Sequence, residues 1–253
     1  NDDFIEKILE RKPKIVWIET PSNPLLRITD IVKITEAAHQ VGSVVVVDNT
    51  FLSPALQQPL NLGADIVIHS TTKYINGHSD VEGGAVITKS QEHYEYLKFW
   101  ANCLGLTASP FDSYLTLRGL RTLKARLALH LVNTKSIVNV LTQHQAVQKT
   151  YYPGLKDHPG HAIALTQQSD FGAMISFELK DTEEVKVFLQ KLKYFSLAES
   201  LGGVESLVAH PASMTHASMD ALALRTAGIS QGLLRLSVGI EDVEDLCTDI
   251  RDA

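Results

Sequence analysis

The chain has 253 residues, of which 44% are hydrophobic, 21% charged and 7% aromatic. This composition excludes disordered, fibrous and disulfide-scaffolded chains, and the length allows one large domain or two modest ones. Lys and Arg number 23 against 29 Asp and Glu, a net charge of −6. The acidic balance argues against nucleic acid or an anionic membrane surface as the main partner.

Cysteine usage and hydropathy bear on the compartment. Cys103 and Cys247 lie far apart and match no metal-binding or disulfide spacing, which favours a reducing, cytoplasmic compartment. The longest apolar runs are much shorter than the roughly 18 residues that a membrane span needs. No targeting segment is visible, so we expect a cytoplasmic protein with no membrane partner.

Four short apolar runs in the first third of the chain predict strands: residues 15–18, 44–47, 66–68 and 85–87. Continuous apolar runs are typical of strands buried on both faces of a parallel sheet. Between the first two runs, Asp30 is a candidate N-cap of a helix that ends before Gly42. The pattern predicts a strand-helix-strand unit.

Polar residues follow three of these runs directly: Glu19-Thr20, Asp48-Asn49 and residues 69–73. In open α/β sheets, ligands bind at the carboxyl ends of the strands. We therefore expect the three polar groups to converge on one crevice.

The second half of the chain has a different pattern. A long helix is predicted from Asp112 to about His144, with a break or kink because of its length, and a loop follows at 151–160. Beyond the loop, the expected elements are a strand at 171–179, a helix at 182–193, a strand at 233–238 and a helix at 241–251. They suggest a small α+β domain, so we expect an α/β large domain with a mostly parallel sheet over residues 1–125 and a C-terminal small domain over residues 126–253.

Two groups of residues could carry chemistry at the carboxyl ends of the strands. Ser70, Thr72 and Lys73 combine hydroxyls that can hold phosphate with an amine that can react with an aldehyde. Asp48 ends an all-valine strand, where a carboxylate needs a cationic partner such as a protonated pyridine nitrogen. The alternatives are a solvated turn for residues 70–73 and a helix-capping role for Asp48.

Arg235 lies inside the apolar run at residues 233–236, where a guanidinium is costly to bury without an anion. A substrate carboxylate would satisfy it, and an internal ion pair is the alternative. His158 and His161 have metal-like spacing, but they flank Pro159-Gly160 and have no third ligand nearby, so no metal site is expected.

Several longer strings resemble the Cys/Met-metabolism family of fold type I pyridoxal phosphate enzymes, and together they span nearly the whole chain. They are residues 19–24 (ETPSNP), 47–51 (VDNTF), 65–80 (DIVIHSTTKYINGHSD), 198–206 (AESLGGVES), 214–217 (MTHA) and 234–241 (LRLSVGIE). Within the family, residues 111–123 and 171–178 are most similar to cystathionine γ-synthases, and the γ-lyases come next.

The resemblance implies roles around the cofactor, pyridoxal 5′-phosphate. Lys73 matches the lysine that binds the cofactor aldehyde covalently and then transfers protons, and Asp48 matches the partner of the pyridine nitrogen. Ser70 and Thr72 match phosphate-binding hydroxyls. Asn23 matches the residue beside the 3-hydroxyl group.

Three further positions match substrate-binding residues of the family. Arg235 matches the arginine that binds the substrate α-carboxylate, and Ser200 matches the serine that steers the released lysine amine. Glu199 matches a pocket position that could meet a distal ammonium group.

The function implied by the resemblance is a γ-replacement that joins L-cysteine to O-succinyl- or O-acetyl-L-homoserine, giving cystathionine in methionine biosynthesis and transsulfuration. The alternatives are a γ-lyase or β-lyase that cleaves cystathionine, and a catalytically silent fragment or scaffold of this fold. A nicotinamide-dependent dehydrogenase is disfavoured because no GxGxxG motif follows a strand. The resemblance also implies a homotetramer of dimers that share active sites, with an additional N-terminal portion contributing to the cofactor site.

Overall fold

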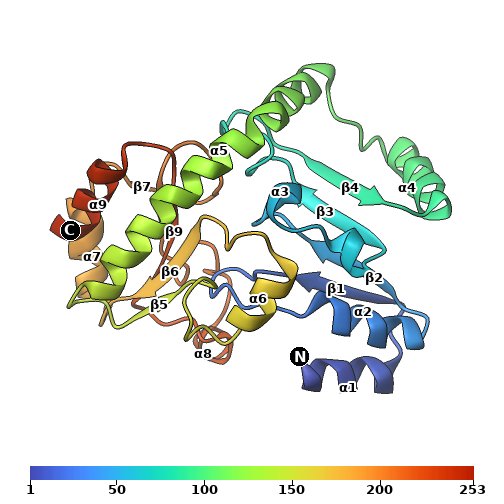
Figure 1. The fold of residues 1–253 in the computed structure, drawn as a ribbon, viewed down its shortest axis with the longest axis horizontal. Helices are drawn as coiled ribbons and strands as arrows, with labels where there is room; N and C mark the ends of the chain where they lie inside the picture. Colours follow the sequence, from blue (N-terminus) through green and yellow to red (C-terminus); the bar gives the residue numbers. More distant parts are fainter. The chain divides into compact units, whose positions relative to one another are not determined.

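The computed structural model describes residues 1–253, which form two compact units (Figure 1). Unit 1 contains Asn1–Pro21, Ile28–Leu123 and Ala162–Ser169, and unit 2 contains Ser22–Arg27, Lys124–His161 and Asp170–Ala253. The chain changes unit between Leu123 and Lys124, inside a long helix. The predicted boundary near residue 125 does not account for two short segments. Ser22–Arg27 precedes this boundary but belongs to unit 2, and Ala162–Ser169 follows it but belongs to unit 1.

Unit 1 is built on a four-stranded sheet in the order β1-β2-β3-β4. Strands β1 (Ile15–Glu19), β2 (Val44–Asp48) and β3 (Ile66–Ser70) are parallel, and their register pairs Glu19 with Asp48 and Asp48 with Ile68. Strand β4 (Gly84–Thr88) is antiparallel to β3. The predicted mostly parallel sheet is confirmed, and β4 is its one antiparallel strand because the 13 residues between Ser70 and Gly84 form turns instead of a crossover helix.

Helices α1 (Asp2–Arg11) and α2 (Ile31–Gln40) pack against one face of this sheet. Buried residues from α1, α2, β1 and β2 form one apolar cluster, in which Ile31 and Ile34 are fully buried. Asp30 caps α2, since its carboxylate accepts a hydrogen bond from the backbone N–H of Lys33 at 3.1 Å. Gly42 follows the helix with φ +77°, as its predicted position requires.

The expectation that these strands are buried on both faces is wrong for β4, in which Val86 and Ile87 are 52% and 40% exposed, and for β1. The burial of β1 alternates, and Ile15 and Trp17 are 59% and 57% exposed. Side chains of a strand alternate between the two faces, and α1 and α2 cover the face that carries Val16 and Ile18. Ile15 and Trp17 lie on the other face of β1, which remains largely exposed.

The remaining elements of unit 1 are short, apart from one surface helix. They are α3 (Ser53–Leu56), the 3₁₀ helix η1 (Pro59–Leu62), α4 (Gln91–Leu104) and α6 (His161–Gln167). The long helix is α5 (Pro110–Gln143), which is uninterrupted over 34 residues, so the predicted break does not occur. None of the helices is long and apolar enough to span a bilayer.

Unit 2 is a five-stranded sheet in the order β5-β6-β9-β8-β7. The strands are β5 (Lys149–Tyr151), β6 (Met174–Glu178), β7 (Ser196–Leu197), β8 (Leu207–Ala209) and β9 (Leu233–Ser237), and the helices are α7 (Thr182–Lys191), α8 (Ala221–Ala227) and α9 (Val243–Asp252). All neighbouring strands are antiparallel except β7 and β8. Apolar residues of α5, α7 and α9 form a cluster with Leu234 and Leu236 of β9, so Leu233 and Arg235 lie on the opposite face.

Candidate active site

Asp48 ends β2 with one carboxylate oxygen held by the protein. Its Oδ1 accepts a hydrogen bond from the backbone N–H of Thr50 at 2.9 Å, and no residue of the chain hydrogen-bonds its Oδ2. The side chain is half-buried, whereas Val45, Val46 and Val47 before it are buried. An anchored carboxylate with one open oxygen suits a cationic N–H group, such as the protonated ring nitrogen of pyridoxal phosphate. The hydrogen bond from Thr50 to Oδ1 is local, like the capping role considered as the alternative for Asp48. Because it uses only Oδ1, it is compatible with cofactor binding at Oδ2.

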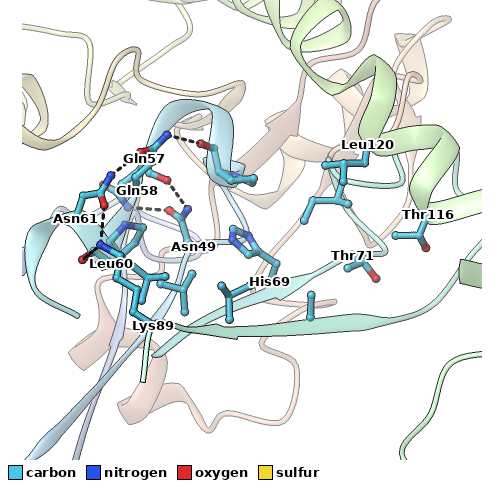
Figure 2. A pocket seen from close by; sticks show the side chains of 16 residues that line it. Asn49, Gln57, Gln58, Leu60, Asn61, His69, Thr71, Lys89, Thr116 and Leu120 are labelled. Carbon is cyan, nitrogen blue, oxygen red and sulfur yellow. Dashed lines mark hydrogen bonds between the residues drawn. The ribbon is translucent and has the colours of Figure 1, made fainter. Parts of the chain in front are cut away.

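A network of three buried amide side chains fixes the residues that follow Asp48, and Figure 2 shows two of them, Asn49 and Gln57. Gln57 Nε2 donates to Asn49 Oδ1 at 2.9 Å and to the Thr20 carbonyl at 3.0 Å. Asn49 Nδ2 donates to the carbonyls of Ser53 and Gln57. Gln167 Nε2 donates to Gln57 Oε1 at 3.2 Å. Every polar atom of the Gln57 side chain is thus hydrogen-bonded. Glutamines at these positions have no local sequence signal, so the network cannot be predicted from the sequence.

Asn49, Gln57 and His69 also line a groove of about 420 Å³ in unit 1 (Figure 2). Most of the other lining residues are apolar, and Thr116 and Leu120 of α5 lie across from His69 in this view. His69 is 3% exposed, and burial lowers its pKa below the usual 6.5, although Asp48 and the Asn49 backbone act in the opposite direction. The groove does not include Asp48, Ser70, Thr72 or Lys73. Alternation along β3 places His69 and Ser70 on opposite faces of the sheet.

The turn after β3 carries Ser70, Thr72 and Lys73, and backbone hydrogen bonds fold it tightly. Thr71 N–H donates to the Gly83 carbonyl at 2.9 Å, and Lys73 N–H donates to the Ser70 carbonyl at 3.3 Å. Thr72 Oγ1 accepts the Gly83 N–H at 2.9 Å. The Thr72 hydroxyl proton donates to the Gly83 carbonyl oxygen at 3.4 Å, a long hydrogen bond that a phosphate oxygen can replace. The hydroxyls of Ser70 and Thr72 and the amine of Lys73 therefore lie within four residues, as a phosphate-bearing aldehyde requires.

Gly119 of α5 permits a close approach to the segment that follows Lys73. A Cβ atom at Gly119 would lie 2.2 Å from the Asn76 carbonyl oxygen and 2.7 Å from that of Ile75. Such a separation is far inside van der Waals contact, so no other residue fits without a shift of the backbone. Gly119 lies within one of the family-like strings, where no local pattern indicates its contact with Asn76.

In unit 2, Arg235 is held by two oxygen atoms on the face of the sheet opposite to α5, α7 and α9. Its Nη1 donates to Asn23 Oδ1 at 2.8 Å, and its Nη2 donates to the Ser200 carbonyl at 2.9 Å. The side chain is 3% exposed. These two acceptors fix the orientation of the guanidinium, whose planar set of donors suits a carboxylate ligand. Asn23, expected beside the cofactor 3-hydroxyl, is here a partner of Arg235.

Ser200 lies in a loop with constrained backbone geometry. Its φ is +78°, in the left-handed region that non-glycine residues rarely adopt. The loop is fixed by a hydrogen bond from Gly202 N–H to Ser237 Oγ at 2.8 Å. Glu199, its neighbour, is exposed. Strained residues of this kind concentrate at functional sites, and the role of Ser200 toward the lysine amine stays a prediction.

The histidines have structural contacts. His161 Nδ1 lies 2.7 Å from the Pro153 carbonyl oxygen, and its ring stacks on Phe171. His158 Nδ1 accepts the Gly160 N–H. His216 is partly buried, and burial together with the positive charge of Arg235 lowers its pKa.

The eight predicted site residues thus divide between the two units. Asp48, Ser70, Thr72 and Lys73 lie at the carboxyl ends of β2 and β3 in unit 1. Asn23, Glu199, Ser200 and Arg235 belong to unit 2, where Arg235 contacts Asn23 and Ser200 directly.

Comparison with known proteins identifies the family. The family model described as "Cys/Met metabolism PLP-dependent enzyme" matches residues 1–253. Cystathionine gamma-synthase of Escherichia coli (strain K12) is 54% identical over 253 residues, which are 100% of this chain and 66% of that protein. Cystathionine beta-lyase of Lactococcus lactis subsp. cremoris (strain MG1363) is 51% identical over 253 residues, again 100% of this chain, and 67% of the relative.

A solved structure gives the same result. Cystathionine gamma synthase from Xanthomonas oryzae pv. oryzae, in complex with cystathionine, superimposes with a TM-score of 0.97 at 61% sequence identity. The match covers 100% of this chain and 65% of that one, so the chain spans about two thirds of the length of these relatives. The chain has the α/β fold of these fold type I enzymes and belongs to the Cys/Met metabolism family of pyridoxal phosphate-dependent enzymes.

Proposed function

We propose that the protein catalyses a γ-replacement, in which the sulfur of L-cysteine displaces the acyloxy group of an O-acylated L-homoserine to form cystathionine and a carboxylic acid. The observation that carries the proposal is the arrangement in unit 1. Lys73 shares a tight turn with Ser70 and Thr72, and this turn follows the strand next to the one that ends in Asp48. The 54% and 61% identities to cystathionine synthases support the proposed reaction.

Each unit 1 residue has a role that its chemistry permits. Pyridoxal phosphate, when bound, supplies an electron-withdrawing ring. The open Oδ2 of Asp48 would keep the ring nitrogen protonated, and the hydroxyls of Ser70 and Thr72 would hold the phosphate. The Lys73 amine would hold the aldehyde group and, in the presence of substrate, would serve as the base for the proton on the substrate α-carbon.

The unit 2 residues act on the substrate. Arg235, oriented by Asn23 and Ser200, binds the α-carboxylate that all amino-acid substrates carry. Glu199 is exposed and acidic, which suits the ammonium group of incoming cysteine or the distal ammonium of cystathionine. These assignments rest on the resemblance and on the chemistry of the side chains.

Cleavage of cystathionine is the second candidate, because relatives named as lyases are also about half identical to this chain. A cystathionine beta-lyase and the cystathionine gamma-lyase of Bacillus subtilis (strain 168) are each 51% identical. Addition and cleavage use the same side chains, so the reaction direction is decided by assay.

The decisive experiment compares two reactions of the holoenzyme. One contains L-cysteine with O-succinyl-L-homoserine or O-acetyl-L-homoserine, and the other contains cystathionine alone. Faster formation of cystathionine than its cleavage supports the synthase, and the reverse result supports a lyase. A silent scaffold would show neither reaction, nor the visible absorbance near ~420 nm expected of a bound pyridoxal group.

Assembly and location belong to the same proposal. Helix α4 buries none of its residues, and Tyr96, Phe99 and Trp100 on it are exposed. Clustered exposed aromatic side chains are typical of an interface, which supports self-association. The homotetramer of dimers and the cytoplasmic location are proposed from the resemblance. Sedimentation equilibrium of the purified protein tests the oligomeric state.

A further inference from the structure

Thr50 connects the two elements of unit 1 that would hold opposite ends of the cofactor. Its backbone N–H donates to Asp48 Oδ1 at 2.9 Å. Its side-chain Oγ1 accepts the backbone N–H of Ser70, also at 2.9 Å. One residue therefore bonds to the carboxylate at the end of β2 and to the first residue of the Ser70–Lys73 turn.

The position of this bond in the sheet explains its importance. The backbone pairing between β2 and β3 continues as far as Asn49, whose N–H donates to the Ile68 carbonyl at 2.9 Å. At the next step along β3, the Ser70 N–H bonds to a threonine side chain instead of a backbone carbonyl. The Thr50 hydroxyl thus extends the pairing of the two strands into the loop region, where Asp48 and Ser70 would otherwise be free to separate.

We propose that Thr50 is a positioning residue, which sets the distance between the Asp48 carboxylate and the Ser70–Lys73 turn to that required by the pyridine nitrogen and phosphate of one cofactor molecule. The inference rests on the proposed binding of pyridoxal phosphate. Thr50 acts through Asp48 and Ser70, and it holds them in place before the cofactor arrives.

Two substitutions at Thr50 separate the hydroxyl from the shape of the side chain. Thr50→Val keeps the branched shape but removes the acceptor of the Ser70 N–H. Thr50→Ser removes a methyl group and keeps the acceptor, so it is the conservative variant that should restore function.

Thr88 offers a matched control in the same unit. Its Oγ1 accepts the Ser90 N–H at 3.1 Å and donates to the Asp65 carbonyl at 2.8 Å. It is half-buried like Thr50, but it lies at the end of β4 that pairs with Ile66, away from Ser70. Thr88→Val therefore removes a comparable hydroxyl without touching either cofactor-holding element.

The first measurement is hydrogen exchange of the Ser70 amide in the cofactor-free protein. Thr50→Val should accelerate this exchange by about fivefold or more, which corresponds to one hydrogen bond, whereas Thr50→Ser and Thr88→Val should not. The second is titration of each cofactor-free variant with pyridoxal phosphate, followed by visible absorbance. We expect the dissociation constant to rise about fivefold to tenfold in Thr50→Val, and to stay within about twofold of wild type in Thr50→Ser and Thr88→Val.

The possible outcomes distinguish this inference from the proposed function. If wild type binds pyridoxal phosphate and Thr50→Val binds it equally well, the positioning role is wrong and the proposed function stands. The role is also wrong if Thr50→Ser loses as much affinity as Thr50→Val, or if Thr88→Val loses as much, since either result indicates a general packing effect. If wild type binds no pyridoxal phosphate, both the proposed function and this inference fail.

Discussion

Replacing Gln57 with leucine tests the buried amide network independently of any activity. The leucine side chain has nearly the same volume but no polar atoms. It leaves the Thr20 carbonyl, the Asn49 Oδ1 atom and one N–H of Gln167 without the partner that Gln57 provides. Gln57 is 1% exposed, so water cannot easily replace these bonds.

The expected loss follows from the number of groups left unpaired. Each buried polar group without a partner costs about 1–3 kcal/mol, so three groups at the lower limit give about 3 kcal/mol. For a protein of about this size, 1 kcal/mol corresponds to roughly 2–4 °C in melting temperature. We therefore expect Gln57→Leu to lower the Tm by about 6–12 °C.

Thermal unfolding monitored by circular dichroism measures this loss, with Gln58→Leu as the matched control. Gln58 is the adjacent residue of the same type, but it is exposed and bonds only to Pro54 and Asn61. Its substitution should change the Tm by less than about 2 °C, in line with other surface substitutions. Equal Tm values for the two variants would refute the assignment of the network as a stabilising element.

Four further predictions concern the candidate site. Lys73→Ala should lose the visible band of the covalently bound cofactor while keeping the far-ultraviolet circular dichroism of wild type, because Lys73 lies in a turn; a retained band would contradict its role. Asp48→Asn should lower kcat with the cofactor still bound, since an amide cannot keep the ring nitrogen protonated, and steady-state kinetics showing an unchanged kcat would exclude this role. Arg235→Leu should lower kcat/KM for every substrate, with a loss of transition-state stabilisation of about 1.5–3 kcal/mol. Glu199→Ala should lower kcat/KM only for reactions of cysteine or cystathionine. Equal losses for Glu199→Ala with and without cysteine would mean that Glu199 does not bind the substrate ammonium group. Burial lowers the pKa of His69 in the folded state, so its contribution to stability is present above pH 6.5 and is lost as pH falls below that value. In denaturant unfolding between pH 7 and pH 5, the free energy of unfolding should therefore fall less steeply with pH in His69→Asn than in wild type. The same pH dependence in both proteins would exclude His69 as the cause.

Much of unit 1 could be predicted from local sequence because its signals are local. The valine run of β2 and the Asp30 cap of α2 each occupy a few adjacent residues, and the structure has both elements where the pattern indicated them. The turn with Ser70 and Lys73 was found in the same way. Helices α1 and α4 were not predicted.

The remaining features depend on contacts between distant residues, which no local pattern specifies. Asn23 and Arg235 are 212 positions apart, and no local pattern indicates that they hydrogen-bond to each other. The antiparallel direction of β4 depends on the turns that precede it. The exposure of Trp17 depends on which face of β1 the helices cover, and strand propensity is the same for either face.

The contribution of Gln167 to unit 1 has a consequence for the order in which the protein can fold during synthesis. Its Oε1 accepts the backbone N–H of Ile31, at the start of α2, although the two residues are 136 positions apart. At about 5–20 residues per second, a ribosome adds Gln167 roughly 7–27 s after Ile31. During that interval, the backbone N–H of Ile31 and the Oε1 atom of Gln57 lack the partner that Gln167 provides. Unit 1 is therefore completed only after Lys124–His161 of unit 2 has been synthesised.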